Sequence, residues 1–171
     1  MTDAVDSTKQ GAGRPRFVVD HMVLKLGKYL RILGYDTVWN KTVRTHELID
    51  MANREKRIFL TRNRRLPDQY PPARHVVFLD SADPVQQLRE LVALLHLDTE
   101  KSLFSTCIRC NVPLDRVPDK TDVRASVHPN VYAQYERFYR CPRCGTVFWK
   151  GSHVRNTCRK LGISCPARNG E

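Results

Sequence analysis

The sequence lacks any apolar run close to the ~18 residues that a membrane-spanning helix needs, so a membrane protein is not expected. Residues 1–14 are polar and contain no apolar stretch of the signal-peptide kind, which favours a cytoplasmic protein. Acidic residues are few, at 18 against 29 lysines and arginines, which gives a net charge of +11. This imbalance indicates a polyanionic partner, most often a nucleic acid.

Cysteine is absent from the first 100 of the 171 residues, and all six cysteines follow. The charge divides at the same place. Residues 1–100 carry 16 basic and 13 acidic side chains, whereas residues 101–171 carry 13 and 5. This asymmetry predicts two modules with a boundary near residue 100.

Four of the cysteines form two CxxC pairs, Cys107 with Cys110 and Cys141 with Cys144. Two such pairs offer four thiolates in a tetrahedron, which is typical of structural Zn²⁺. Asn111 and Gly145 follow the pairs at turn positions that favour a positive φ. A disulfide pair and a redox-active CxxC are the alternatives, and a cytosolic setting disfavours disulfides.

The other two cysteines, Cys158 and Cys165, form no CxxC pair. Buried small residues or free thiols are the favoured interpretation, and a second metal site is the alternative.

Apolar runs alternate with amphipathic segments over residues 16–100. We expect strands at 17–20, 36–39, 57–61 and 75–79, and helices at 21–33, 45–55 and 84–97. In the first helix, Met22, Leu26, Leu30 and Leu33 form one apolar stripe, with Arg31 on another face. Thr45 is expected to cap the second helix. The alternation predicts an α/β fold with a parallel sheet covered on both sides.

Polar side chains follow three of the expected strands: Asp20, then Asn63, then Asp80 with Asp83. Sites of parallel sheets form at the carboxyl ends of the strands, and oxygen ligands suit Mg²⁺ or Mn²⁺. Basic side chains that could hold phosphate lie beside them, namely Arg62, Arg64 and Arg65. The combination is typical of a phosphodiester hydrolase.

Each of these residues also has a structural interpretation. Asp20 could cap the helix that follows it, and capping is the favoured role for Asp80 and Asp83. The arginines could form a solvated loop, and Glu47, a further candidate in the second expected helix, could be a solvated helix residue.

Several segments resemble one known family. They are Phe17-Val-Val-Asp20-His-Met22, Leu30-Arg-Ile-Leu-Gly-Tyr-Asp-Thr37, Arg57-Ile-Phe-Leu-Thr-Arg62, Cys107-Ile-Arg-Cys-Asn111, Cys141-Pro-Arg-Cys-Gly145 and Phe148-Trp-Lys-Gly-Ser-His153. Over about residues 16–160 the chain resembles a PIN-like RNase family named after the C-terminal RNase domain of the mutator-seven exonuclease. The resemblance implies a PIN-like α/β fold, a metal-dependent RNase site and an appended zinc ribbon that contacts RNA.

The resemblance also implies which residues form the site. Asp20 matches the first acid of the family. The family usually has acids where Thr45 and Asn63 stand here, and Glu47 could replace the one at Thr45. The expected catalytic set is therefore Asp20, Glu47, Asn63 and Asp80, around Mg²⁺ or Mn²⁺. A site with fewer carboxylates binds such an ion more weakly.

Aromatic and basic residues alternate near the second CxxC pair, and this pattern is typical of RNA contact. Arg143, Trp149, Lys150 and His153 are the candidates. The alternative is that the rings form the core of a small ribbon and that His153 has a structural role.

We therefore expect a disordered tail at 1–15, a PIN-like RNase domain at 16–100, a zinc ribbon with a basic C-terminal helix at 101–162, and a tail at 163–171. The leading hypothesis is a metal-dependent ribonuclease that acts as an endonuclease and whose ribbon binds RNA. The alternative is a catalytically decayed protein that binds RNA, a ribosome or another ribonucleoprotein. A protein-interaction module and a zinc-stabilised DNA binder are further candidates.

Overall fold

Four parallel strands form the central sheet of the N-terminal part. The computed structural model describes residues 13–165. The strands are β1 (Phe17–Val19), β2 (Thr37–Val38), β3 (Ile58–Thr61) and β4 (Val76–Phe78). They lie in the order β2-β1-β3-β4, and every neighbouring pair is parallel. After β1 the chain therefore adds β2 on one side of it, and then adds β3 and β4 on the other side.

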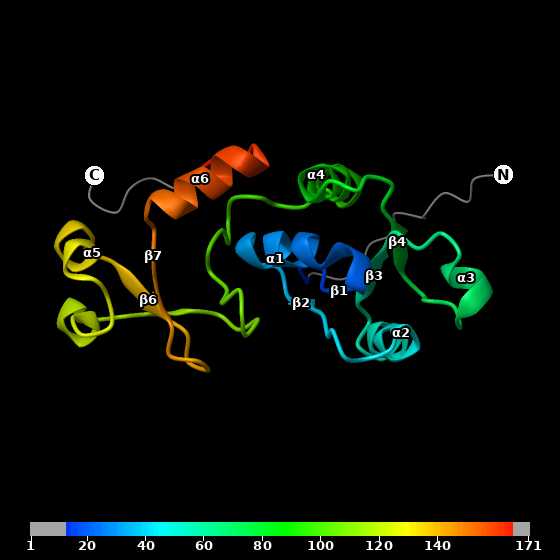
Figure 1. Cartoon of the computed structure of the whole chain (residues 1–171), viewed down its shortest axis with the longest axis horizontal. Helices are drawn as coiled ribbons and strands as arrows, with labels where there is room; N and C mark the ends of the chain where they lie inside the picture. Colours follow the sequence, from blue (N-terminus) through cyan, green and yellow to red (C-terminus); the bar gives the residue numbers. More distant parts are fainter. Residues whose placement is uncertain (1–12, 166–171) are drawn as a thin grey trace.

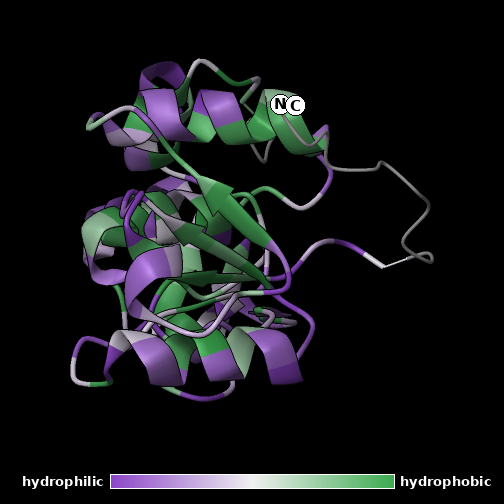
Figure 2. Ribbon diagram, turned by 90° about the vertical axis from the view of Figure 1, so that its right-hand side faces the viewer, coloured by the Kyte–Doolittle hydropathy of each residue, from purple (hydrophilic) through white to green (hydrophobic). Residues whose placement is uncertain are grey.

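Helices cover both faces of this sheet (Figure 1). They are the 3-10 turn η1 (His21–Val23), then α1 (Leu24–Ile32), α2 (Thr45–Arg54), α3 (Leu66–Gln69) and α4 (Pro84–Leu95). Successive strand side chains point to opposite faces, so neighbouring residues enter different cores. Val19 packs with α1 and α4, whereas Val18 packs with α2. The strands are accordingly built mostly of hydrophobic residues (Figure 2), and these residues contribute to a core on each face of the sheet.

The predicted α/β fold with a covered parallel sheet is confirmed, and the four strands and three helices lie close to their predicted positions. Two local predictions are wrong. Met22 is 55% exposed, because the helix starts with a 3-10 turn of three residues per turn and Val23 takes the buried place. Thr45 is the first helical residue, and Arg44 before it is the cap.

The C-terminal part holds a small antiparallel sheet. Its strands are β5 (Asp115–Arg116), β6 (Phe138–Arg140) and β7 (Val147–Trp149), in that order. The connection from β5 to β6 contains η2 (Lys120–Val123) and α5 (Pro129–Gln134). The first CxxC pair precedes β5 in sequence, and the second lies in the turn between β6 and β7.

The last helix, α6 (Ser152–Leu161), returns to the N-terminal part and packs against α4 (Figure 1). Its buried side chains Val154, Cys158 and Leu161 belong to the same hydrophobic cluster as α1 and α4. The basic C-terminal helix was predicted, but sequence periodicity gave no indication that it shares a core with the parallel sheet. Among residues 13–165, no helix is long and apolar enough to cross a membrane.

Candidate active site and metal centre

Asp20 lies at the carboxyl end of β1 and is only 4% exposed. Its side chain caps η1, with Oδ1 accepting a hydrogen bond from the Met22 backbone N–H at 2.6 Å. Its Oδ2 accepts a hydrogen bond from the Thr61 hydroxyl at the end of β3. The capping interpretation is thus confirmed. The carboxylate can still accept further hydrogen bonds or bind a metal ion, because each oxygen has two lone pairs.

The Asp20–Thr61 pair stands where the strand order reverses, between β1 and β3. In open parallel sheets, crevices for ligands form outside the carboxyl ends of the strands at such a point. The loop after β3 continues from the same place, since the Asn63 N–H donates to the Thr61 hydroxyl at 3.0 Å. Asp20 and Asn63, predicted as site residues, are therefore joined through one threonine.

Asn63 and Glu47 also form hydrogen bonds with residues close to them in sequence. Asn63 Oδ1 accepts from the Arg65 backbone N–H at 3.1 Å, and its Nδ2 donates to Gln69 Oε1 at 3.1 Å. Glu47 is exposed in the first turn of α2, where Oε2 accepts from the Arg44 backbone N–H at 2.9 Å. Because β2 leads into α2, Glu47 lies toward the same carboxyl edge of the sheet as Asp20.

Asp80 does not cap α4, so the capping interpretation is wrong for this residue. It is exposed and forms an ion pair with Arg64, whose guanidinium also lies 5.4 Å from the centroid of the Phe78 ring. The cap is Asp83, which accepts from the Gln86 N–H at 3.0 Å, with Pro84 as the first helical residue. Arg64 is therefore neutralised in part by Asp80 rather than free.

These residues follow strands at the carboxyl edge of the sheet, but among residues 13–165 no three acidic ligand atoms lie close together at this edge. Within residues 13–165, the four-cysteine group is the only set of three or more His, Cys, Asp or Glu whose ligand atoms come close together.

Two buried polar atoms near this edge have no hydrogen-bond partner among the described residues. They are Nε of Arg62, one residue after Thr61, and Oε1 of Gln87 in α4. Gln87 is 1% exposed, and its amide Nε2 donates to the Ser81 carbonyl at 2.8 Å. Sequence reasoning missed Gln87. The sequence could have indicated its burial, because Gln87 lies one turn before Leu91 on the apolar stripe of α4.

The four predicted metal ligands, Cys107, Cys110, Cys141 and Cys144, form one cluster whose sulfur atoms all lie within 4.8 Å of one another. Cys107 Sγ and Cys144 Sγ are 3.9 Å apart. Four sulfurs around a zinc ion at ~2.3 Å would be separated by about 3.8 Å, so the arrangement fits a tetrahedral thiolate site. All six cysteines are free, which excludes the disulfide alternative for this structure.

The two CxxC turns have the same hydrogen-bonded construction. Asn111 N donates to Cys107 O, and Gly145 N donates to Cys141 O, both at 2.9 Å. Their φ angles are +58° and +70°, as predicted for the residues after the pairs. Hydrogen bonding with Thr146 lowers the pKa of the Cys144 thiol to about 6. The four thiols can hold a metal ion, and the donor set is the one that zinc prefers.

The RNA-contact candidates of the ribbon lie on its surface or partly within it. Arg143 and His153 are exposed, whereas Trp149 and Lys150 are half-buried. His153 packs edge-to-face on Trp149 with a centroid distance of 5.7 Å. Desolvation by the surrounding residues lowers the pKa of His153, which favours its neutral form near pH 7. The predicted role in RNA contact stays a prediction.

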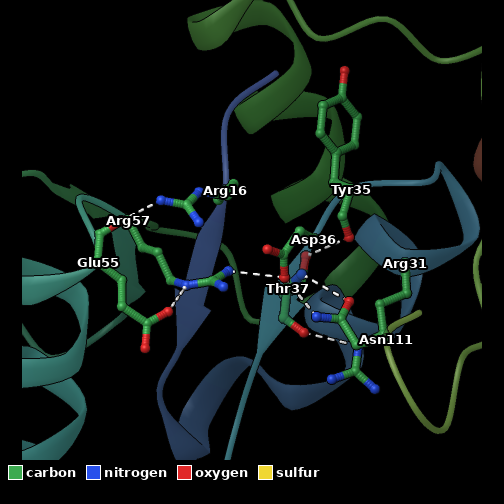
Figure 3. Close-up of polar contacts among 8 residues, drawn as sticks. All are labelled: Arg16, Arg31, Tyr35, Asp36, Thr37, Glu55, Arg57 and Asn111. Atoms are coloured by element: carbon green, nitrogen blue, oxygen red, sulfur yellow. Dashed lines mark hydrogen bonds and ion pairs between the residues drawn. The ribbon is translucent and has the colours of Figure 1, made fainter. Parts of the chain in front are cut away.

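A polar network joins the first CxxC turn to the amino edge of the parallel sheet (Figure 3). Asn111 Nδ2 donates to Asp36 Oδ1 at 2.5 Å, and Arg57 Nη1 lies 2.8 Å from the same carboxylate oxygen. Arg31, which is 6% exposed, donates to the Thr37, Ile108 and Arg109 carbonyls at 2.7–3.0 Å. The sequence places Arg31 off the apolar stripe, and the structure shows it buried, with its guanidinium against the first CxxC turn. Burial lowers its pKa to about 10, so it stays cationic at neutral pH.

The comparison with known families decides the relationship of this chain. Its sequence matches the family described as the Mut7-C RNAse domain over residues 15–161. The chain belongs to this family. The match includes the parallel sheet, both CxxC turns and α6, so the Mut7-C RNAse resemblance seen in the sequence is confirmed over both parts of the protein. No curated protein and no solved structure matches the chain.

Proposed function

We propose that this Mut7-C RNAse domain is a metal-dependent ribonuclease, acting as an endonuclease at the carboxyl edge of a PIN-like sheet. The observation that carries the proposal is the position of Asp20, a buried carboxylate at the strand-order reversal, in a chain of an RNase family. Arg62 supports it, because this half-buried arginine directly follows Thr61 and its guanidinium supplies donors for a phosphate oxygen.

In this proposal Asp20 is the principal ligand for Mg²⁺ or Mn²⁺, and Asn63, Glu47 and Asp80 contribute oxygen atoms from the neighbouring loops. Such an ion would lower the pKa of bound water and stabilise charge on the reacting phosphate. Thr61 holds the Asp20 carboxylate in one orientation through its hydroxyl. Arg62 and Arg65 would hold the RNA backbone beside the site. The four cysteines would bind Zn²⁺ and keep the ribbon folded.

A second candidate function is RNA or ribosome binding without cleavage. The observation that favours it is that two of the other proposed oxygen ligands are an uncharged amide and a carboxylate already paired with an arginine. Asn63 stands where the family usually has an acid, and its amide is bonded to Gln69. Asp80 is paired with Arg64. These arrangements leave Asp20 with little acidic support for a divalent ion.

The deciding experiment is cleavage of single-stranded and structured RNA with Mn²⁺ or Mg²⁺, and without added divalent ions. A chelator is avoided because it would also remove metal from the cysteines. Activity in the wild type that is lost in Asp20→Asn, but kept in the exposed control Asp50→Asn, would support the nuclease. An inactive wild type that gains activity in Asn63→Asp would support the second candidate. Equal cleavage by the wild type and Asp20→Asn would contradict the assigned site.

A further inference from the structure

A basic pocket of about 650 Å³ lies between the first CxxC turn and the edge strand β2. Four arginines line it, Arg31, Arg57, Arg109 and Arg143, together with Asp36 and Asn111. Its volume is within the range of pockets that bind small molecules or nucleotides. It is separate from the candidate active site, because Asp36 and Arg57 precede their strands whereas Asp20 follows its strand.

The four guanidinium groups are not equally engaged. Arg57 is held by Asp36 and Glu55, and the Arg31 Nε and Nη1 atoms donate to backbone carbonyls. Arg109 and Arg143 are exposed, and within residues 13–165 neither side chain has a hydrogen bond or an ion pair. They occupy the same position in the two CxxC turns, one residue before the second cysteine. The construction of the metal site therefore directs two free guanidinium groups toward one pocket.

The arginines that line the pocket favour a ligand that carries phosphate. Planar guanidinium groups bind phosphate oxygens through paired hydrogen bonds, which gives both affinity and orientation. None of the described residues that line the pocket is aromatic, so it offers no ring on which a base could stack. We propose that Arg109 and Arg143 form a phosphate-binding subsite that takes a backbone phosphate of RNA. This inference rests on the proposed function, since it takes RNA as the source of the phosphate.

The position fits an RNA strand that also reaches the active site. The pocket borders the amino edge of the parallel sheet, and Asp20 lies at the carboxyl edge. A strand of three residues, such as β1, separates these edges by roughly 10 Å. An RNA chain that passes along edge strand β2 would contact both places.

If Arg109 and Arg143 served only to stabilise the metal site, a different result would be expected. A zinc ion with four thiolates carries a formal charge of −2, and two neighbouring arginines would offset it. In that case their removal would lower the affinity for zinc and leave RNA binding unchanged. The subsite predicts weaker RNA binding at equal zinc content.

The test measures binding of a short fluorescein-labelled oligouridylate by anisotropy at several salt concentrations, without added divalent ions. We expect Arg109→Gln with Arg143→Gln to weaken binding by at least about tenfold. The log-log salt dependence should become less steep by about 0.7 for each phosphate that the protein no longer binds. The matched control is Arg159→Gln, an exposed arginine of α6 outside the pocket, for which no change in affinity is expected.

A second double variant keeps the positive charge. Arg109→Lys with Arg143→Lys retains the offset to the thiolates but removes the planar fork, so it should keep wild-type zinc content and bind RNA less tightly. Unchanged affinity and unchanged salt dependence in both double variants would overturn the subsite.

Phosphorus NMR of inorganic phosphate separates this proposal from the proposed function. If the wild type binds no RNA even at low salt, the RNA function fails and RNA is overturned as the phosphate source. Broadening of the phosphate signal by the wild type, but not by the glutamine double variant, would then still support a phosphate-binding pocket. No broadening would overturn the pocket as well.

Discussion

Oδ1 of Asn111 accepts a hydrogen bond from the backbone N–H of Thr37 at 3.0 Å. Thr37 begins the edge strand β2, and Asn111 closes the first CxxC turn. The turn that carries two of the metal ligands therefore also supplies a side-chain partner for the edge of the parallel sheet. We therefore expect the stability of the sheet to depend on that of the cysteine cluster.

Replacing Asn111 by glycine tests this coupling. Glycine accommodates φ = +58° without strain, so the substitution removes the two side-chain hydrogen bonds and little else. We expect the free energy of unfolding to fall by about 1–3 kcal/mol, measured by urea denaturation. In Asn111→Ala it should fall further, because alanine is strained at a positive φ. A glycine variant as stable as the wild type would show that the contact contributes nothing.

The sequence predicts the parallel sheet well because local patterns determine it. Phe17-Val-Val and the stripe of Leu26, Leu30 and Leu33 are periodic signals, and all of these residues are buried. The failures occur where the signal is not periodic. Met22 continues the stripe in the sequence, but a single 3-10 turn shifts its phase and leaves it exposed.

The contacts between the two parts of the chain could not be predicted in this way. Arg31 is separated by 77 residues from Ile108, whose carbonyl it binds. A buried arginine in a helix resembles a solvated one in sequence, since its partners are backbone carbonyls that have no sequence signature. The cysteine cluster was predictable because the CxxC spacing itself encodes the geometry. For Asp20, the strand end predicted the position, but the Thr61 hydroxyl that holds it could not be inferred.

The thiol cluster leads to a prediction of metal content. Purified protein should contain about one zinc ion per chain, since four thiolates complete the coordination of one ion. Cys110→Ser should lower the zinc content and destabilise the ribbon. Cys165→Ser is the control, because this exposed cysteine lies outside the only close ligand group among residues 13–165. Elemental analysis measures the content, and loss of zinc in the control would instead indicate a second metal site.

The hydroxyl of Thr61 is predicted to stabilise the buried site at the end of β1. It donates to Asp20 and accepts from the Asn63 N–H, so Thr61→Val leaves a buried carboxylate with one partner fewer. We expect the variant to lose about 1–3 kcal/mol of stability, measured by thermal or urea unfolding. Thr61→Ser retains the hydroxyl and should lose less. Equal losses in the two variants would contradict this role, because Thr61→Val removes the hydroxyl and keeps the methyl group, whereas Thr61→Ser does the reverse.

The same pair gives a prediction for activity if the protein cleaves RNA. Thr61 is a positioning residue, so Thr61→Val should raise the Mn²⁺ concentration needed for half-maximal cleavage, with partial rescue in Thr61→Ser. A lower rate at saturating Mn²⁺ without a change in the metal requirement would contradict a role in orienting Asp20.

The Asp36 carboxylate predicts how stability depends on pH. Burial alone would raise its pKa, but hydrogen bonds from Arg57 and Asn111 outweigh this effect and hold the pKa below its usual value. In the unfolded chain the group titrates near ~3.9. The folded state therefore gains stability from ionised Asp36 above about pH 4, and it loses this gain as the pH falls through the lower folded pKa.

Asp36→Asn should remove this part of the acid sensitivity. Urea unfolding from pH 3 to pH 7 should show that the difference in stability between the wild type and the variant is largest near pH 7 and shrinks below pH 4. Asp50→Asn is the control, since Asp50 is exposed and has no ion pair among the described residues. A wild-type advantage that stays constant down to pH 3 would mean that the Asp36 charge does not act through Arg57. The ion pair of a half-exposed carboxylate with an arginine side chain only 8% exposed would then contribute through packing alone.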